Sequence, residues 1–310
     1  MRNSPNILVV GSYATGLVMQ VERLPLAGET LIGHGFRQGP GGKGSNQAVQ
    51  AARLGADVSV IACLGNDAFA ESAKSLHTRE SVDTRHLFIH PELPTGAGFI
   101  MVDAHGNNLI TVDLGANLAL GDAHLQKASA AFEQANVVLA QFEIPPGTAL
   151  AALHRARKSG ARTILNPAPA VDLRSFDLSS VDYLTPNEAE ARACLGLDPA
   201  DPASEEELAS MLLDLGVGAI VFTRGAAGAR LVARDRDLQQ AAFPVEVVDT
   251  VGAGDSFNAA FAVGLAEGMS EADALRFGCA AGSLAVTRAD TIDSYGHRDQ
   301  VEAFLTKHPH

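Results

Sequence analysis

The sequence contains few cysteines and no long apolar run. Its three cysteines, Cys63, Cys194 and Cys279, are scattered and form no C-x-x-C pair, so neither a zinc site nor a redox motif is expected. The first apolar run, residues 7–10, is too short for a signal peptide, and no run of about 18 apolar residues could span a membrane. We therefore expect a protein of the reducing cytoplasm that does not insert into a membrane.

Basic residues are also scarce. The 310 residues include 23 Lys and Arg against 36 Asp and Glu, which gives a formal net charge of −13 at pH 7. This acidic balance disfavours nucleic acids and anionic membranes as partners. Two catalytic patterns are missing as well. The ten histidines show no H-E-x-x-H spacing and no G-x-S-x-G occurs, which disfavours a histidine-based metal site and a serine hydrolase.

The remaining composition is typical of an α/β protein. Apolar residues make up 46% of the chain and charged residues 19%. Short Val/Ile/Leu runs alternate with amphipathic segments, which is the pattern of a mostly parallel sheet covered by helices. The expected strands are residues 7–10, 58–62, 137–141, 163–166, 182–184 and 219–223. The expected helices are residues 45–54, 68–78, 148–159, 187–195, 204–215, 254–267 and 271–286.

Two segments interrupt this alternation. Residues 17–22 and 29–36 resemble short strands around a Pro-Gly turn, and residues 99–102 and 108–112 flank a hairpin signal that contains Gly and Asn. Together they predict a small antiparallel sheet inserted into the α/β body. No repeat and no linker marks a boundary between domains.

The strongest local signal is the segment 249–258, Asp-Thr-Val-Gly-Ala-Gly-Asp-Ser-Phe-Asn, which follows a strand-like run at 245–248 and opens an apolar helix. Glycines let backbone N–H groups surround an anion, and the N-terminus of a helix adds donors and positive partial charge. Asp249 and Asp255 bracket the glycines. This favours a catalytic anion hole over an ordinary helix start with structural glycines.

A second glycine-rich segment, 39–47, reads Gly-Pro-Gly-Gly-Lys-Gly-Ser-Asn-Gln and also leads into a helix. Lys43 and Asn46 among glycines indicate close approach to a polar ligand. The segment is not a Walker A loop, because Gly44 stands where Ser or Thr should follow the Lys. It does fit G-x-G-x-x-G, so a dinucleotide-dependent oxidoreductase is an alternative hypothesis, although this is not the first strand-turn-helix of the chain.

Polar residues follow three further expected strands. Asn187 and Glu190 are three residues apart at a helix start, so they share one helical face. Such a pair suits either water-mediated Mg²⁺ binding or an N-cap Asn with a capping-box Glu, and the local sequence alone favours the capping box. Thr223 and Gly225 lie in a turn that suits a nucleotide phosphate or ribose, and Glu143 also follows a strand.

In this order the motifs resemble the ribokinase-like (PfkB) family of carbohydrate kinases over nearly the whole chain. The segments that carry the resemblance are residues 41–48, 115–117, 166–170, 185–190 and 249–257. The resemblance implies a doubly wound α/β body with a small β-sheet lid. We therefore expect a single domain over residues 1–310 with a lid from about 13–38 and 95–113, and a homodimer formed through the lid.

The resemblance also implies roles for the motif residues. Asp255 is expected to take the proton from the primary hydroxyl of a sugar. Gly252, Ala253 and Gly254 are expected to bind the transferring γ-phosphoryl group together with the Asp255 amide, because phosphoryl transfer depends on positioning and charge stabilisation. The residues expected to contact the sugar are Gly42, Lys43, Asn46, Glu143 and Asp255.

The same resemblance implies sites for ATP and for metal ions. Asn187, Thr223 and Gly225 are expected to hold ATP, and Glu190 is expected to order the waters of Mg²⁺. A monovalent cation, usually K⁺, is expected beside the anion hole. Its ligands would be Asp249, the Val251 carbonyl and Ser294.

Four positions depart from the family pattern. Ala14 and Gly16 stand where an Asn and an Asp that contact the sugar are expected, and this leaves the identity of the sugar open. Cys279 replaces a His near the adenine, and Asp290 replaces a Gly near the cation site.

The leading hypothesis is an ATP-dependent kinase that phosphorylates the primary hydroxyl of a sugar, either ribose or a related sugar. Tyr13 or Thr15 is then a candidate contact to a different sugar or a nucleoside. One alternative is accordingly a nucleoside kinase of the same family. Another is a noncatalytic sugar or nucleoside sensor, which the loss of polar residues at positions 14 and 16 motivates. The presence of Asp255 argues against a sensor, because a binding module needs no base.

Overall fold

A nine-stranded sheet forms the centre of the protein, whose computed structural model describes residues 4–308. Its strands are β1 (Asn6–Val10), β4 (Asp57–Leu64), β5 (Val82–Ile89), β8 (Val137–Gln141), β9 (Arg162–Asn166), β10 (Tyr183–Leu184), β11 (Ala219–Thr223), β12 (Ala229–Ala233) and β13 (Asp237–Gln240). The order across the sheet is β13-β12-β11-β10-β9-β8-β1-β4-β5. The strands from β5 to β11 run parallel, whereas β12 runs antiparallel to β11 and β13 antiparallel to β12.

Both faces of this sheet are buried, because its central strands are apolar on both sides. In β1, Ile7 and Val9 belong to the hydrophobic cluster on one face, and Leu8 and Val10 belong to the cluster on the other. Successive side chains of a strand alternate between faces, so a continuous apolar run fills two clusters at once. The predicted doubly wound, mostly parallel sheet is confirmed.

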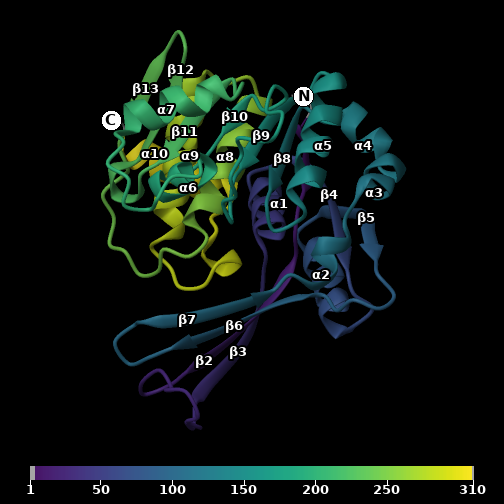
Figure 1. Cartoon of the computed structure of the whole chain (residues 1–310), viewed down its shortest axis with the longest axis vertical. Coiled ribbons are helices and arrows are strands. Elements are labelled where there is room, and N and C mark those ends of the chain that lie inside the picture. Colours follow the sequence, from purple (N-terminus) through teal and green to yellow (C-terminus); the bar gives the residue numbers. More distant parts are fainter. Residues whose placement is uncertain (1–3, 309–310) are drawn as a thin grey trace.

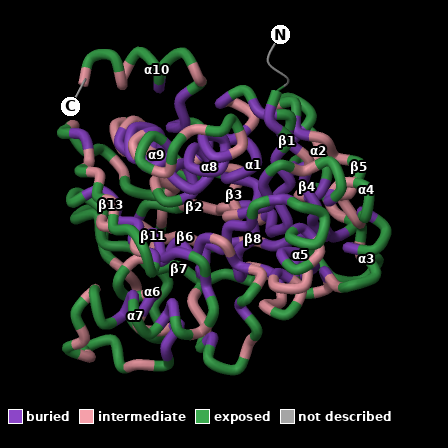
Figure 2. The backbone as a smooth tube through the Cα atoms, turned by 90° about the horizontal axis from the view of Figure 1, so that it is seen from above, coloured by how far each residue is buried: buried purple, intermediate pink, exposed green. Residues whose placement is uncertain are grey.

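Helices cover the two faces of the sheet. They are α1 (Lys43–Arg53), α2 (Ala68–Arg79), α3 (Asp122–Lys127), α4 (Ser129–Gln134), α5 (Pro146–Lys158), α6 (Glu188–Cys194), α7 (Glu205–Asp214), α8 (Ala253–Ala266), α9 (Glu271–Ala285) and α10 (Arg298–Lys307). Helices α1, α8, α9 and α10 pack on one face and α3 to α7 on the other, while α2 packs against β5. In Figure 2, α1, α8 and α9 form a largely buried centre and α10 lies at the exposed periphery.

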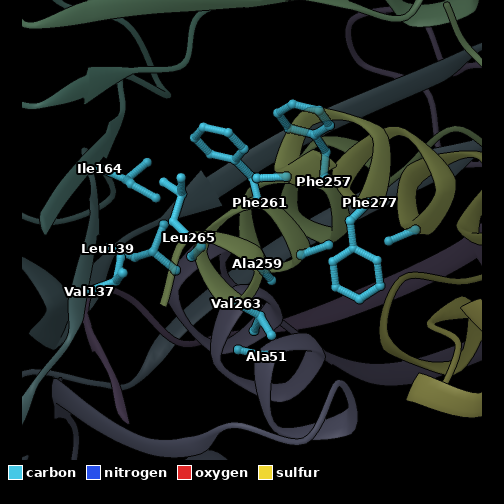
Figure 3. Close-up of a cluster of buried hydrophobic side chains, with 14 of the residues drawn as sticks. Ala51, Val137, Leu139, Ile164, Phe257, Ala259, Phe261, Val263, Leu265 and Phe277 are labelled. Carbon is cyan, nitrogen blue, oxygen red and sulfur yellow. The ribbon is translucent and has the colours of Figure 1, made fainter. Parts of the chain in front are cut away.

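Helix α8 is held against the sheet by aromatic side chains. Phe261 meets the Tyr183 ring edge-on with 5.3 Å between centroids, and it stacks on Phe257 at 6.0 Å. Figure 3 shows both phenylalanines in one cluster with Leu139 of β8 and Ile164 of β9. Because each such side chain contributes about 1.5–3 kcal/mol when buried, the start of α8 has a fixed position over the sheet.

A separate four-stranded sheet, the lid, projects from one end of the body (Figure 1). It consists of β2 (Ala14–Gln20), β3 (His34–Gly41), β6 (Gly96–Val102) and β7 (Asn108–Asp113), in the order β3-β2-β6-β7. The outer pairs are antiparallel, but β2 and β6 are parallel, so the predicted wholly antiparallel sheet is wrong at its central pair. The reason is that β2 follows β1 and β6 follows β5, and both therefore leave the body from the carboxyl ends of parallel strands.

Element boundaries follow the sequence most closely at the centre of the sheet. The strands predicted at 137–141 and 219–223 match β8 and β11 to the residue. The strand predicted at 245–248 is wrong: these residues form no strand, and Val247 and Val248 are about 60% exposed. Within residues 4–308, no helix has the length and apolar character needed to cross a membrane.

Candidate active site

The site lies where the chain reverses its winding direction between β1 and β8. From β1 the sheet continues to β4 and β5, and from β8 it continues to β9 and onward, so the two carboxyl ends diverge at this point. Ligand sites of open α/β sheets form outside the carboxyl ends at such switch points. Ser12 follows β1 and Glu143 follows β8, and the Ser12 hydroxyl donates to Glu143 Oε2 at 2.5 Å.

The first turn of α1 closes one side of this site. Gly42 precedes the helix with φ 88°, and a Cβ there would lie 2.7 Å from Ala14 N, so glycine is required for both conformation and space. The Lys43 N–H donates to Glu143 Oε2 at 2.8 Å. The predicted sugar contacts Gly42, Lys43 and Glu143 are therefore neighbours in space.

The Lys43 ammonium lies among three carboxylates. Asp255 is the largest cause that raises the pKa of Lys43, and Glu143 and Glu190 add to the shift, whereas burial acts in the opposite direction. The raised pKa keeps this ammonium charged at neutral pH. Residues from four distant parts of the sequence thus contribute to one charged cluster.

Asp255 occupies the first turn of α8 and is only 5% exposed. Its Oδ2 accepts a hydrogen bond from Asn46 Nδ2 at 2.8 Å, and its Oδ1 accepts one from Gln47 Nε2 at 2.9 Å. Two amides from α1 therefore fix the orientation of the carboxylate. The Asn46 Oδ1 atom is buried and has no partner within the described residues, which leaves one acceptor available to a ligand hydroxyl.

Sequence reasoning missed the amide network behind Asp255. Gln47 Nε2 also donates to Asn166 Oδ1 at 3.2 Å, and Gln141 Nε2 donates to Gln47 Oε1 at 2.6 Å. Gln141 and Asn166 are the last residues of β8 and β9. A polar side chain that ends an otherwise apolar buried strand is the signal that would have indicated them.

The start of α8 supplies backbone donors. Gly252 adopts a left-handed conformation with φ 79°, and Tyr295 donates its hydroxyl hydrogen to Gly252 O at 3.1 Å. The Ala253 N–H donates to Thr250 O at 3.3 Å. Within residues 4–308, the N–H groups of Gly254 and Asp255 have no backbone acceptor, as expected for the first turn of a helix.

The residues predicted to hold a monovalent cation lie beside this helix start. Asp249 Oδ1 accepts a hydrogen bond from the Val251 N–H at 3.0 Å. Ser294 lies in the short 3₁₀ helix η3 (Ile292–Ser294) and donates its hydroxyl hydrogen to Thr291 O at 2.7 Å. A Cβ at Gly252 would lie 2.5 Å from Cγ2 of Thr291, the residue before η3, so the segment leading into η3 packs closely against Gly252.

The start of α6 forms the capping box that the local sequence favours. The Asn187 N–H donates to Glu190 Oε2 at 2.9 Å, and the Glu190 N–H donates to Asn187 Oδ1 at 2.8 Å. Burial raises the pKa of Glu190, whereas the hydrogen bond from the Asn187 N–H and the charge of Lys43 lower it and the charge of Asp255 raises it further. Glu190 therefore interacts electrostatically with both Lys43 and Asp255. The Thr223 N–H donates to Pro186 O at 2.9 Å, beside the capping box.

Comparison with known proteins relates this geometry to an enzyme family. Residues 4–297 match the family described as pfkB family carbohydrate kinase. The ribokinases of Haemophilus influenzae and Bacillus subtilis are 36% and 39% identical, covering 96% and 97% of this chain and 98% and 99% of theirs. The chain belongs to the pfkB family of carbohydrate kinases.

Further relatives of this pfkB member extend the comparison. A deoxyribokinase of Salmonella typhi is 32% identical over 97% of this chain and 99% of its own length. The Arabidopsis thaliana ribokinase, solved in complex with ribose and ATP, is 31% identical and has a TM-score of 0.88 over 98% of this chain and 99% of that chain. The protein is an ATP-dependent carbohydrate kinase.

Membership of the pfkB family excludes the dinucleotide-dependent oxidoreductase. Gly39 and Gly41 lie within strand β3 of the lid, so the G-x-G pattern does not form the turn between a first strand and its helix. That hypothesis is wrong. The glycines instead serve the lid and its junction with α1.

The structure does not support sugar contacts from Tyr13 or Thr15. Tyr13 is 1% exposed and packs with Leu64 and Ile292 in a third hydrophobic cluster, while Thr15 is also 1% exposed and its hydroxyl lies 3.4 Å from the Tyr13 hydroxyl. Burial raises the pKa of Tyr13. Strand alternation places Ala14 on the opposite face of β2 from Tyr13 and Thr15.

Cys279 and Asp290 are the two other departures from the family pattern, and one lies in the core and the other at the surface. Cys279 is a buried residue of α9, and burial raises the pKa of its thiol to about 12, so it is an inert core residue. Asp290 has a left-handed conformation with φ 69°, and its Oδ1 lies 2.8 Å from Nη1 of Arg37 in the lid. This ion pair joins the lid to the segment before η3.

Proposed function

We propose that the protein transfers the γ-phosphoryl group of ATP to the primary hydroxyl of ribose or a related sugar, with Asp255 as the general base. The observation that carries the proposal is the buried Asp255 carboxylate, which the amides of Asn46 and Gln47 orient at the first turn of α8. A carboxylate at a helix N-terminus is a weak base. It accepts the hydroxyl proton late, as the new O–P bond forms and the bond to the leaving ADP oxygen breaks.

The start of α8 is the proposed anion hole for the transferring group. The open N–H groups of Gly254 and Asp255 and the positive end of the helix are suited to the charge on the phosphoryl oxygens. The Ala253 N–H is bonded to Thr250 O, so its contribution requires this bond to open.

The sugar is proposed to lie between α1 and the carboxyl end of β8. Lys43 supplies a positive charge, and the buried Asn46 Oδ1 supplies an acceptor without a partner. Glu143 and the Gly42 backbone complete the contacts. An unpaired buried oxygen costs about 1–3 kcal/mol, which a sugar hydroxyl in hydrogen-bond contact would recover.

ATP is proposed to occupy the adjoining turn, with contacts from Asn187, Thr223 and Gly225. The bond from the Thr223 N–H to Pro186 O holds this turn beside the start of α6. Glu190 fits a role in Mg²⁺ binding because only one of its carboxylate oxygens is used by the capping box. Mg²⁺ keeps several waters and takes few protein ligands, and the ion would neutralise the phosphates of ATP.

A monovalent cation is proposed beside the anion hole, held by Asp249, the Val251 carbonyl and Ser294. The Ser294 hydroxyl donates its hydrogen to Thr291 O and so keeps oxygen lone pairs for a cation. The Asp249 carboxylate uses one oxygen for the Val251 N–H, and the other remains for the ion. We expect K⁺ to increase turnover relative to choline at the same ionic strength.

The assembly and location are also part of the proposal. One face of the lid carries exposed apolar side chains that include Phe36, Phe99 and Leu109, at 61%, 61% and 42% exposure. Such a patch fits a homodimer formed through the two lids. Three free buried cysteines and the use of ATP favour the cytoplasm.

A coupled ADP-release assay tests the function directly. The acceptors are pentoses, deoxypentoses, hexoses and nucleosides, each with Mg²⁺ and either K⁺ or Na⁺. We expect turnover with at least one sugar, and phosphorus NMR of the product should show an ester of the primary hydroxyl. Failure of every acceptor to raise ADP release above the acceptor-free rate would contradict the proposal and favour a noncatalytic sensor.

A further inference from the structure

The end of the lid sheet nearest the body, beside the proposed sugar site, carries almost no side chains on one face. Cross-strand pairing places Ala14 between Gly41 and Gly96, and in the next row on that face Gly16 lies between Gly39 and Gly98. Residues paired directly across a sheet point to the same face. We call this surface the bare face, and its residues are Ala14, Gly16, Gly39, Gly41, Gly96 and Gly98.

The bare face is directed toward the body of the protein. It begins next to α1, because a Cβ at Gly42 would lie 2.7 Å from Ala14 N. Tyr13 points the other way, into the core. One row further out, Arg37 lies on the same side of the lid sheet as the bare face, and it forms its ion pair with Asp290 of the body.

The two sides of the acceptor site therefore differ in chemistry. The body contributes Asp255, Lys43 and the unpartnered Asn46 Oδ1. The lid contributes β2, whose backbone groups are used on one side by β3 and on the other by β6. Further out on the same face, the aliphatic residues Val18 and Ile100 lie opposite each other. A sugar here finds hydrogen-bond partners on its body side and apolar contacts on its lid side.

The bare face also leaves room for ligand atoms. A Cβ at Gly39 would meet no atom within 4 Å, and at Gly16 the nearest atoms, Gly39 O and Ile100 Cδ1, would lie 3.7 Å away. Neither glycine has a positive φ, so backbone conformation does not explain the missing side chains. The space that polar side chains would fill at these positions is open.

We propose that the acceptor sugar presents an edge without free hydroxyls to the bare face, either because it is deoxygenated there or because an apolar group is attached there. A hydroxyl buried against this surface finds no partner, and each such hydroxyl weakens binding by about 5- to 150-fold. The inference rests on the proposed function, since it takes the acceptor site of that function as given. Both kinds of sugar share this chemistry, and the test separates them.

Binding and turnover of matched acceptors are measured separately. Isothermal titration with a nonhydrolysable ATP analogue present gives dissociation constants for ribose, 2-deoxyribose, 3-deoxyribose and methyl β-ribofuranoside, and ADP release gives turnover. We expect at least one analogue to bind about 10-fold or more tightly than ribose. A smaller preference, or no binding of any analogue, overturns the inference. Selective binding of an analogue without ADP release would contradict the proposed function and support the inference.

Two substitutions on the bare face provide the second readout. Gly16→Asp and Gly39→Ser each add a polar group in open space. Each is therefore expected to change the ratio of the dissociation constants of ribose and its best analogue by about 10-fold in favour of ribose. Gln38→Asp is the matched control, because Gln38 is exposed on the opposite face of β3. Thermal unfolding verifies that each variant is folded. If both bare-face variants keep the wild-type ratio, as the control should, the inference falls.

Discussion

Glu190 combines a structural role and a proposed catalytic role in one side chain. Burial raises its pKa, so the folded protein binds a proton there more tightly than the unfolded chain does. Stability therefore falls as the pH rises through the interval between the ordinary and the raised pKa, and it is highest below that interval. The capping box needs only the oxygen that accepts from the Asn187 N–H.

Glu190→Gln should separate these two roles. Gln keeps an acceptor for the cap and carries no buried charge, so we expect a melting temperature at neutral pH equal to or above that of the wild type. Activity at limiting Mg²⁺ should fall about 10- to 100-fold, the usual cost of losing a group that acts through metal-bound water. Thermal unfolding from pH 5 to 8 without metal and Mg²⁺ titrations of turnover measure the two effects. Lower stability at every pH with unchanged Mg²⁺ dependence would refute both assignments.

Asp290 is a residue at which conformation and charge oppose each other. Its left-handed φ costs about 1–2 kcal/mol for an ordinary residue. The ion pair with Arg37 returns at most about 1 kcal/mol, because both side chains are 49% exposed. We expect Asp290→Gly to be neutral or stabilising and Asp290→Ala to be destabilising by up to about 1 kcal/mol. Denaturant unfolding of the two variants checks the difference, and equal losses would show that the φ carries no strain.

At the scale of elements, the start of α8 is expected to respond in opposite ways to two similar substitutions. Gly254 has helical geometry and no atom within 4 Å of a new Cβ, so Gly254→Ala should stabilise the protein by about 0.5–1 kcal/mol. Gly252→Ala should destabilise it by at least about 1–2 kcal/mol, because φ is 79° and the new atom would lie 2.7 Å from the Tyr295 hydroxyl.

Both substitutions should lower turnover, since one fills the space before the anion hole and the other displaces its loop. Thermal unfolding and ADP release on the same samples measure the two quantities. Loss of stability in Gly254→Ala would mean that the start of α8 is more crowded than the structure shows.

The sequence predicts a strand correctly where its own apolar run is enough to determine it. Strands β8 and β11 are apolar on both faces and were predicted to the residue, whereas β13 (Asp237–Gln240) is polar, lies at an edge and was missed. The apolar run at 245–248 predicted a strand that does not form, because no neighbouring strand pairs with it among the described residues.

In the active site too, only the residues that carry a local signal are predicted from the sequence. Asp255 and Lys43 stand in glycine-rich segments, which is a local signal. Gln47, Gln141 and Asn166 meet only after two separate strands and a helix have come together. Their hydrogen bonds depend on long-range packing that no local pattern encodes. The sequence therefore predicts the charged groups of the site better than the amides that orient them.

At the scale of the whole molecule, the fold compensates for a shortage of cations. The protein has a net charge of −13 and binds an anionic nucleotide. Groups at or next to the ends of β1, β8, α1, α6 and α8 come together at the switch point of the sheet. They provide backbone N–H groups and the half-buried ammonium of Lys43. Bound Mg²⁺ would supply the remaining positive charge.

The assembly is also a prediction for the whole molecule. Phe99 is a 61% exposed aromatic residue of the lid, so Phe99→Glu should convert the proposed dimer into monomers by placing a charge in its interface. Met211, exposed on α7 of the body, provides the control Met211→Glu, which should remain dimeric. Light scattering coupled to size exclusion measures the mass. A wild-type monomer at all concentrations would contradict the lid-mediated dimer.

Asp255 is proposed to remove the proton from the acceptor hydroxyl. The most direct measurement is steady-state turnover of Asp255→Asn with its best acceptor and saturating ATP. The control is Asp299→Asn, which alters an exposed Asp in the first turn of α10. We expect kcat to fall by about 10²–10⁴-fold with a folded protein and an unchanged control. Turnover of Asp255→Asn within a few-fold of the wild type would contradict the role of Asp255 as the base.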